Sequence, residues 1–140
     1  MNVLIDTNVV IDVLAQREPF FEHSQLILLA SEQRHLNGFV SASAITDIFY
    51  IASKFLKSKA VARELLKKHL IDTVKIATVR DDIIYEALSA EWNDFEDCVQ
   101  YFVGESIGAD YIVTRNPEDF SVGTIKAVSP KELLNIIAPE

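Results

Sequence analysis

The chain has 140 residues, of which 49% are hydrophobic and 24% charged, and its formal net charge is −8. This composition predicts one folded domain, residues 1–140, and excludes a disordered chain. No apolar stretch reaches the roughly 18 residues of a membrane span, and the N-terminus lacks the pattern of a signal peptide. The single cysteine, Cys98, excludes an internal disulfide and a cysteine-rich zinc site. These features predict a cytoplasmic protein without a membrane anchor.

The charge is unevenly distributed along the chain. Residues 54–69 carry six of the 13 Lys and Arg residues against one acid, Glu64, whereas residues 81–97 carry seven acids and no Lys or Arg. The negative total disfavours a protein that binds nucleic acid through bulk charge. It does not exclude a nuclease, because a metal site needs acidic ligands of its own.

Apolar periodicity and turn residues predict strands that alternate with helices. In chain order we expect a strand at 3–5, helices at 8–14 and 20–33, a strand at 36–41, helices at 42–56 and 59–70, a strand at 74–79, helices at 81–90 and 95–107, strands at 111–114 and 125–128, and a helix at 130–137. This alternation predicts a three-layer α/β/α fold with a central parallel sheet of about five strands.

Polar side chains follow or flank the predicted strands. Asp6 comes directly after the first strand, Asp47 lies in the helix after the second, Asp97 opens the helix before the fourth, and Asn116 follows the fourth by two residues. In open parallel sheets, ligands bind beyond the carboxyl ends of the strands, where the strand order reverses. The topology is therefore expected to bring these side chains to one edge.

Each acid alone has a simpler explanation. Asp6 can cap the next helix, Asp47 can be an exposed helix position, and Asp94, Glu96 and Asp97 suit a helix N-terminus. Taken together, several carboxylates in one small space repel each other unless a divalent cation lies among them. Oxygen ligands of this kind suit Mg²⁺ or Mn²⁺.

Three stretches of the sequence resemble one known family. They are VLIDTNVVIDVL at the N-terminus, SASAITDIFYIA in the middle and DFEDCVQYFVGESIGADYIVTRNPEDF near the end. In this order and spacing they are similar to the motifs of PIN domains, over nearly the whole chain. The resemblance implies a parallel α/β sheet with helices on both sides and the activity of a metal-dependent endoribonuclease that hydrolyses phosphodiester bonds. Many such proteins are the toxin of a toxin–antitoxin pair, of the VapC type.

The resemblance carries the family's acidic positions across to this chain one at a time. Asp6 falls on the first acid, Asp47 on the second, which is commonly Glu, Asp97 on the third, and Asn116 on the fourth, which is Asp or Asn. These four are the expected catalytic residues. Asp6, Asp97 and Asn116 are the expected ligands of Mg²⁺ or Mn²⁺. The residues expected to support them are Thr7, Asn8, Thr114 and Asp119.

Two positions depart from the commoner residues of the family. Asp47 is one methylene shorter than Glu, and Asn116 is neutral. Asp6 and Asp97 remain as the charged ligands, which favours one strong cation site, with a second filled only when RNA phosphate supplies oxygens. An alternative stays open, in which the chain is a catalytically reduced PIN scaffold that binds RNA or protein.

An RNA substrate needs positive charge on the protein. Residues 54–69, with Lys54 and Lys57, are the expected contact, although a solvated helix face explains the same charges equally well. Arg115 follows Thr114 at the predicted site and either contacts phosphate or pairs with a nearby acid. Aromatic residues such as Tyr50 are mostly core or interface by their spacing, and base stacking by one of them is a weaker expectation. The RNA itself is expected to be single-stranded or a structured loop.

The resemblance also implies protein partners. Toxin-type PIN domains pair as homodimers and are inhibited by an antitoxin protein that crosses the acidic groove. The stretch ITDIFYIASKFL has more apolar residues than one core face needs. Such a surface suits a dimer or an antitoxin.

Two other classes of protein also place an aspartate after the first strand. Phosphatases with an aspartyl nucleophile need a second Asp two residues later, where this chain has Asn8. Receiver-like domains need paired acids after the first strand and a lysine after the last, and neither is convincing here. Both classes are therefore disfavoured.

Overall fold

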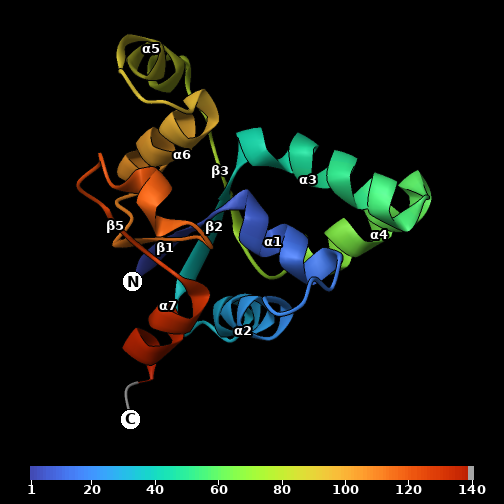
Figure 1. Ribbon diagram of the computed structural model, residues 1–140. Helices are drawn as coiled ribbons and strands as arrows, with labels where there is room; N and C mark the ends of the chain where they lie inside the picture. Colours follow the sequence, from blue (N-terminus) through green and yellow to red (C-terminus); the bar gives the residue numbers. More distant parts are fainter. Residues whose placement is uncertain (139–140) are drawn as a thin grey trace.

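A five-stranded parallel sheet forms the centre of the protein in a computed structural model that describes residues 1–138 (Figure 1). Its order is β3-β2-β1-β4-β5. The strands are β1 (Asn2–Ile5), β2 (Asn37–Ser41), β3 (Lys75–Ala77), β4 (Tyr111–Val113) and β5 (Lys126–Val128). The chain adds β2 and β3 on one side of β1 and then β4 and β5 on the other. The strand order therefore reverses between β1 and β4, and ligands bind at such a switch point.

Seven α-helices connect and cover the strands: α1 (Thr7–Leu14), α2 (Phe21–Glu32), α3 (Ala42–Leu56), α4 (Lys59–Leu66), α5 (Asp81–Ser89), α6 (Phe95–Ser106) and α7 (Pro130–Ile137). The predicted α/β/α architecture is confirmed. Two features were not predicted. A π-helical turn, η1 (Lys67–Ile71), ends the helix expected to run to residue 70, and a 3-10 turn, η2 (Pro117–Phe120), follows β4.

The core lies on both faces of the sheet because neighbouring strand residues point to opposite sides. Val3 and Ile5 of β1 pack into a cluster with α1, α2, α3 and α7, whereas Leu4 packs with α5 and α6 on the other face. Figure 1 shows these two helical layers. Strands buried on both faces read as continuous apolar runs, which is why VLI preceded Asp6 without alternation.

Helix α3 leaves the sheet and, with α4, forms an arm on one side of the molecule (Figure 1). Ser41 caps α3 with its side chain, and Lys57, at φ 56°, ends it in a left-handed conformation that turns the chain into α4. None of the helices within residues 1–138 has the length and apolarity needed to cross a bilayer. The arm carries much of the basic segment described above.

Ile112 tests the packing of the face covered by α5 and α6, since it is fully buried in β4. We expect Ile112→Ala to lower the free energy of unfolding by about 2–5 kcal/mol, through lost apolar burial and the cavity left behind. Ile112→Val, the matched control, should cost about 0.5–1.5 kcal/mol. Urea unfolding followed by circular dichroism measures both. Equal, small losses in the two variants would contradict the packing.

Candidate active site

Asp6 is a buried carboxylate at the carboxyl end of the central strand, only 7% exposed. Its Oδ1 accepts hydrogen bonds from the backbone N–H of Thr7 at 2.7 Å and from Nε2 of Gln100 at 2.8 Å. Its Oδ2 accepts one from the Thr114 hydroxyl, also at 2.8 Å. A buried charge is tolerated only when it is paired or hydrogen-bonded, and these donors satisfy that need.

The three donors also restrict what Asp6 can do for a ligand. A carboxylate has about four lone-pair directions, two on each oxygen. Oδ1 already accepts two hydrogen bonds, whereas Oδ2 accepts one. Asp6 therefore offers a cation one oxygen, Oδ2, rather than both.

Thr114, at the end of β4, ties together the residues around Asp6. Its side-chain oxygen donates to Asp6 and accepts from the backbone N–H of Asn116 at 3.1 Å and from Nδ2 of Asn8 at 3.4 Å. The Asn8 side-chain oxygen in turn accepts from the backbone N–H of Arg115 at 3.3 Å. The loop after β4 is thus held against the start of α1, at the strand-order reversal.

An open cleft of about 480 Å³ lies above Asp6. It gathers acids from four separate parts of the chain: the end of β1, the first half of α3, the N-terminus of α6 and η2. The residues that line it are Asp6, Thr7, Asn8, Ile11, Arg17, Asp47, Tyr50, Ile51, Asp94, Glu96, Asp97, Gln100 and Asp119. Five of the predicted site residues do not line it: Lys54, Lys57, Thr114, Arg115 and Asn116.

The crowding of carboxylates in the cleft changes the pKa of Asp97. Burial and the neighbouring carboxylates of Asp94, Asp6 and Asp119 raise the pKa of Asp97 to about 7. Asp94 is also the N-cap of α6, and its side chain accepts from the backbone N–H of Asp97 at 2.9 Å. Close negative charges without a cation between them disfavour ionisation of one member, as here.

Asp47 faces Glu96 across the cleft. A hydrogen bond between their carboxyl groups, with burial and the charges of Asp47, Asp94 and Asp97, raises the pKa of Glu96 to about 7. The structure therefore brings the predicted Asp47 to the cleft, but directs it towards a partner that the sequence interpretation had treated as a helix-end acid.

The donor set suits a hard divalent cation, because it consists of carboxylates in excess of positive charge, and Oδ2 of Asp6 has one lone-pair direction left for a ligand. Within residues 1–138, however, no three His, Cys, Asp or Glu side chains lie close enough to one another to form a ready-made coordination sphere. The carboxylates share a cleft without yet converging on one point.

Two residues of the site were missed by the sequence interpretation. Gln100 is buried, and its Oε1 has no hydrogen-bond partner although its Nε2 holds Asp6. In the sequence, Gln100 could have been noticed as a polar residue that lies one turn after Asp97 among the apolar residues of α6. Arg17 is the one basic residue that lines the cleft, and nothing local in the sequence distinguishes it from other exposed arginines.

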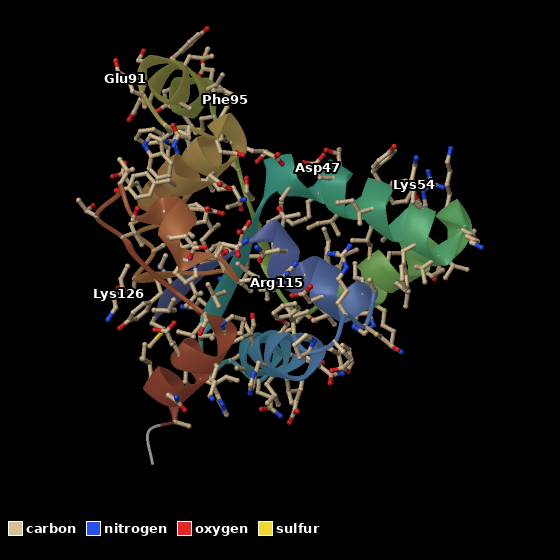
Figure 2. All side chains as sticks on the ribbon, viewed as in Figure 1. Asp47, Lys54, Glu91, Phe95, Arg115 and Lys126 are labelled. Carbon is tan, nitrogen blue, oxygen red and sulfur yellow. The ribbon has the colours of Figure 1, made fainter. Side chains whose placement is uncertain are left out.

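Arg115 does not line the cleft, and Figure 2 places it near α1. Its Nε lies 2.8 Å from Oδ2 of the fully buried Asp12, and its guanidinium is 4.4 Å from the centre of the Phe20 ring. Burial raises the pKa of Asp12, and Arg115 and Arg17 oppose this rise. Of the two roles expected for Arg115, the structure favours the ion pair with a nearby acid over phosphate binding.

Lys54 and Lys57 lie outside the acidic cleft, in a neighbouring groove on the α3–α4 arm. Figure 2 shows Asp47 at the end of α3 near α6 and Lys54 further out along the same helix. The lopsided charge predicted from the sequence is therefore a feature of the surface.

The fold and the cleft together define an α/β/α protein with an acidic cleft at the switch point of its parallel sheet. A family profile described as PIN domain matches residues 2–118. The chain therefore belongs to the PIN domain family.

Individual relatives agree with this assignment. The chain is 22% identical over 132 residues to Ribonuclease VapC1 of Aquifex aeolicus, covering 93% of this chain and 91% of the relative. Mycobacterium tuberculosis VapC20, a toxin that cleaves the sarcin-ricin loop, has a similar structure, with a TM-score of 0.68 at 11% identity over 88% of this chain and 96% of that one. A toxin–antitoxin complex from Klebsiella pneumoniae has a TM-score of 0.66 at 20% identity, over 91% and 97%. At these identities the structural matches show the fold alone.

Thr114 tests the hydrogen bonds that hold Asp6. Thr114→Val keeps the shape but leaves Asp6 Oδ2 and the Asn116 N–H without their partner. We expect this variant to lower the free energy of unfolding by about 1–3 kcal/mol. Thr114→Ser keeps the hydroxyl and should lose distinctly less. Chemical denaturation of the three proteins decides the matter, and similar losses in Val and Ser would show that the hydroxyl contributes little.

The raised pKa of Asp97 leads us to predict that the stability of the metal-free protein depends on pH. Its pKa is about 7 in the folded protein against an ordinary 3.8, so between these pH values the folded state holds more protons than the unfolded state. Stability is then lost as pH rises through this window. Asp97→Asn removes the effect, so its stability relative to wild type should increase from pH 4 to pH 8.

Urea titrations in EDTA at several pH values measure this difference, with Asp72→Asn as a control for losing one exposed carboxyl outside the cleft. A wild-type to Asp97→Asn difference that stays constant with pH would contradict the crowding of charges around Asp97.

Proposed function

We propose that this protein is a metal-dependent endoribonuclease that hydrolyses phosphodiester bonds in RNA, and that it is the toxin of a toxin–antitoxin pair. One observation carries the proposal: acids from β1, α3 and α6, far apart in the sequence, line one cleft at the switch point of a PIN fold. The relation to Ribonuclease VapC1 over most of both chains supports the activity. The likeness to a toxin–antitoxin complex supports an antitoxin partner.

Asp6 and Asp97 are the proposed ligands of the cation, Mg²⁺ or Mn²⁺. When bound, such an ion supplies an acidified water and positive charge beside the phosphate. Gln100, Thr114 and the Thr7 N–H fix the orientation of the Asp6 carboxylate and leave Oδ2 able to accept one further ligand. Its orientation is thus set before the substrate arrives, which lowers the cost of reaching the reactive arrangement.

The remaining acids have separate proposed roles. Asp47 orients the attacking water from the α3 side of the cleft, where it faces Glu96. Asp119 lines the cleft from η2 and adds negative charge beside Asp97. Asn116 was expected as a cation ligand, but within residues 1–138 its hydrogen bonds are made by the backbone: its N–H donates to Thr114, and its carbonyl accepts from the N–H of Asp119. We propose that Asn116 acts mainly by holding the loop after β4.

For the cellular location, the oligomeric state and the protein partner, we propose what is common among toxins of the PIN family. The protein acts in the cytoplasm as a homodimer, and an antitoxin covers the acidic cleft. A positively charged segment of that partner would complement six acids that face a single arginine, Arg17. The RNA is single-stranded, or presents a structured loop.

A second candidate function is a PIN scaffold that binds without cutting. It is favoured by the neutral Asn116, by the pairing of Asp47 with Glu96, and by the lack of a preformed three-carboxylate cluster within residues 1–138. The two functions differ in turnover, so a cleavage assay separates them.

The test is cleavage of a panel of single-stranded and structured RNAs by purified protein with Mg²⁺, with Mn²⁺ or with EDTA. We expect cleavage with either metal and none in EDTA. The cleavage rate of Asp6→Asn/Asp97→Asn should be at least about a hundredfold below that of wild type, since the loss of a positioned catalytic group typically has an effect of this order. Asp72→Asn/Asp110→Asn, with the same change of charge outside the cleft, is the control. No cutting by folded, inhibitor-free wild type would favour the scaffold.

A further inference from the structure

A second groove adjoins the acidic cleft on the α3–α4 arm and has the opposite chemistry. Its volume is about 640 Å³, and it is lined by Phe49, Tyr50, Ser53, Lys54, Lys57, Ser58 and Lys59. The lining contains aromatic rings, hydroxyls and three lysines, and no acid. Within residues 1–138 none of these lysines is within 4.0 Å of a carboxylate, so their charge is not neutralised by the protein.

Tyr50 joins the groove to the acidic cleft, because it lines both. Residues three and four apart lie on the same face of a helix, so Asp47, Tyr50 and Lys54 form one stripe along α3. Seven residues of helix span about 10 Å from the first to the last. Figure 2 shows Asp47 and Lys54 at successive points along this helix. One continuous surface therefore leads from the carboxylates to the lysines.

The Tyr50 side chain is suited to contact a flat ring. It is 57% exposed, although large aromatic side chains on helices are usually buried by packing. The Lys54 ammonium lies over one face of this ring, 4.9 Å from its centre, so a base would stack on the opposite face with the cation close by. Aromatic rings that stack on bases, combined with a positive groove that follows the backbone, are the common means of binding single-stranded nucleic acid.

We propose that this groove binds the single-stranded RNA on one side of the cleavage point, with a base stacked on Tyr50 and phosphates held by Lys54 and Lys57. The inference rests on the proposed function for the nature of the ligand. Charge favours RNA as the occupant of the groove, since a polyanion complements a surface lined by lysines. The acids of the neighbouring cleft repel the same polyanion. The groove thereby supplies the affinity that the cleft, with its six acids, opposes.

The stacking is tested by the affinity of a fluorescein-labelled 12-nucleotide single-stranded RNA, measured by fluorescence anisotropy in EDTA so that no cutting occurs. Tyr50→Leu should weaken binding roughly five- to hundredfold, the range for one lost base–aromatic stack. Tyr50→Phe, which keeps the ring, should bind within about twofold of wild type.

The phosphate contacts are tested by the salt dependence of the same binding. Each phosphate contact to a single strand contributes roughly 0.7 to the slope of log K against log salt, so Lys54→Gln/Lys57→Gln should flatten it by about 1.4. Lys126→Gln/Lys131→Gln is the matched control with the same loss of charge. Both of these lysines are exposed, and Lys126 lies on the far side of the molecule from Lys54 in Figure 2. The control should leave the slope unchanged.

The outcomes separate this inference from the nuclease function. If wild type cuts RNA while the Tyr50→Leu and double-lysine variants bind it like wild type, the inference is overturned and the nuclease function stands. If nothing is cut but the variants lose affinity as expected, the groove is an RNA site on a non-cutting scaffold. A changed oligomeric mass of Tyr50→Leu in light scattering, with unchanged RNA affinity, would assign the face to a protein and overturn the inference, as would wild type that binds no RNA.

Discussion

The buried carboxylate of Asp6 is the constraint on which the site depends. An ionised group at the end of a strand in a parallel sheet must be given hydrogen bonds to replace those of water. Its donors come from the start of α1, from Gln100 in α6 and from Thr114 after β4. Satisfying one charge therefore ties three elements together at the strand-order reversal. The same bonds leave a single oxygen of Asp6 open towards the cleft.

The buried ion pair of Asp12 and Arg115 reinforces this arrangement from the other side of α1. Asp12 lies about one and a half turns after the helix begins, and Arg115 directly follows Thr114. Breaking a buried pair by removing one partner leaves an uncompensated charge, so the pair keeps the loop after β4 in place. Thr114 is then held through its own hydroxyl and through its neighbour. Of the two roles expected for Arg115, the pairing with a nearby acid is the one found, and it supports the position of the residues that hold Asp6.

Local patterns in the sequence predicted the strands and helices because period and capping are local properties. The position of Asp6 was also predictable, since a carboxylate directly after an apolar run is conspicuous. The role of Gln100 and the acid that pairs with Arg115 could not be identified in advance, because their partners, Asp6 and Asp12, lie 94 and 103 residues away. No local signal gives such a pairing. The expected role of Asn116 came from the resemblance alone; Asn116 does not line the cleft, whereas Asp119, which was expected to support the site, does.

Under the proposed function, the crowding of acids in the cleft destabilises the folded protein and also controls the access of RNA to the cleft. Their mutual repulsion raises the pKa of Asp97 and opposes the entry of a polyanion. A cation that binds only the folded protein relieves this repulsion and adds stability, about 2.7 kcal/mol at a hundred times its Kd. RNA phosphate would approach Asp6 and Asp97 more easily with such a cation bound, whereas Lys54 and Lys57, at the far end of α3, would attract RNA with or without it. Acidic Asp47 and basic Lys54 lie at different points along α3. Their positions imply an order of events in which RNA is held beside the cleft before it enters.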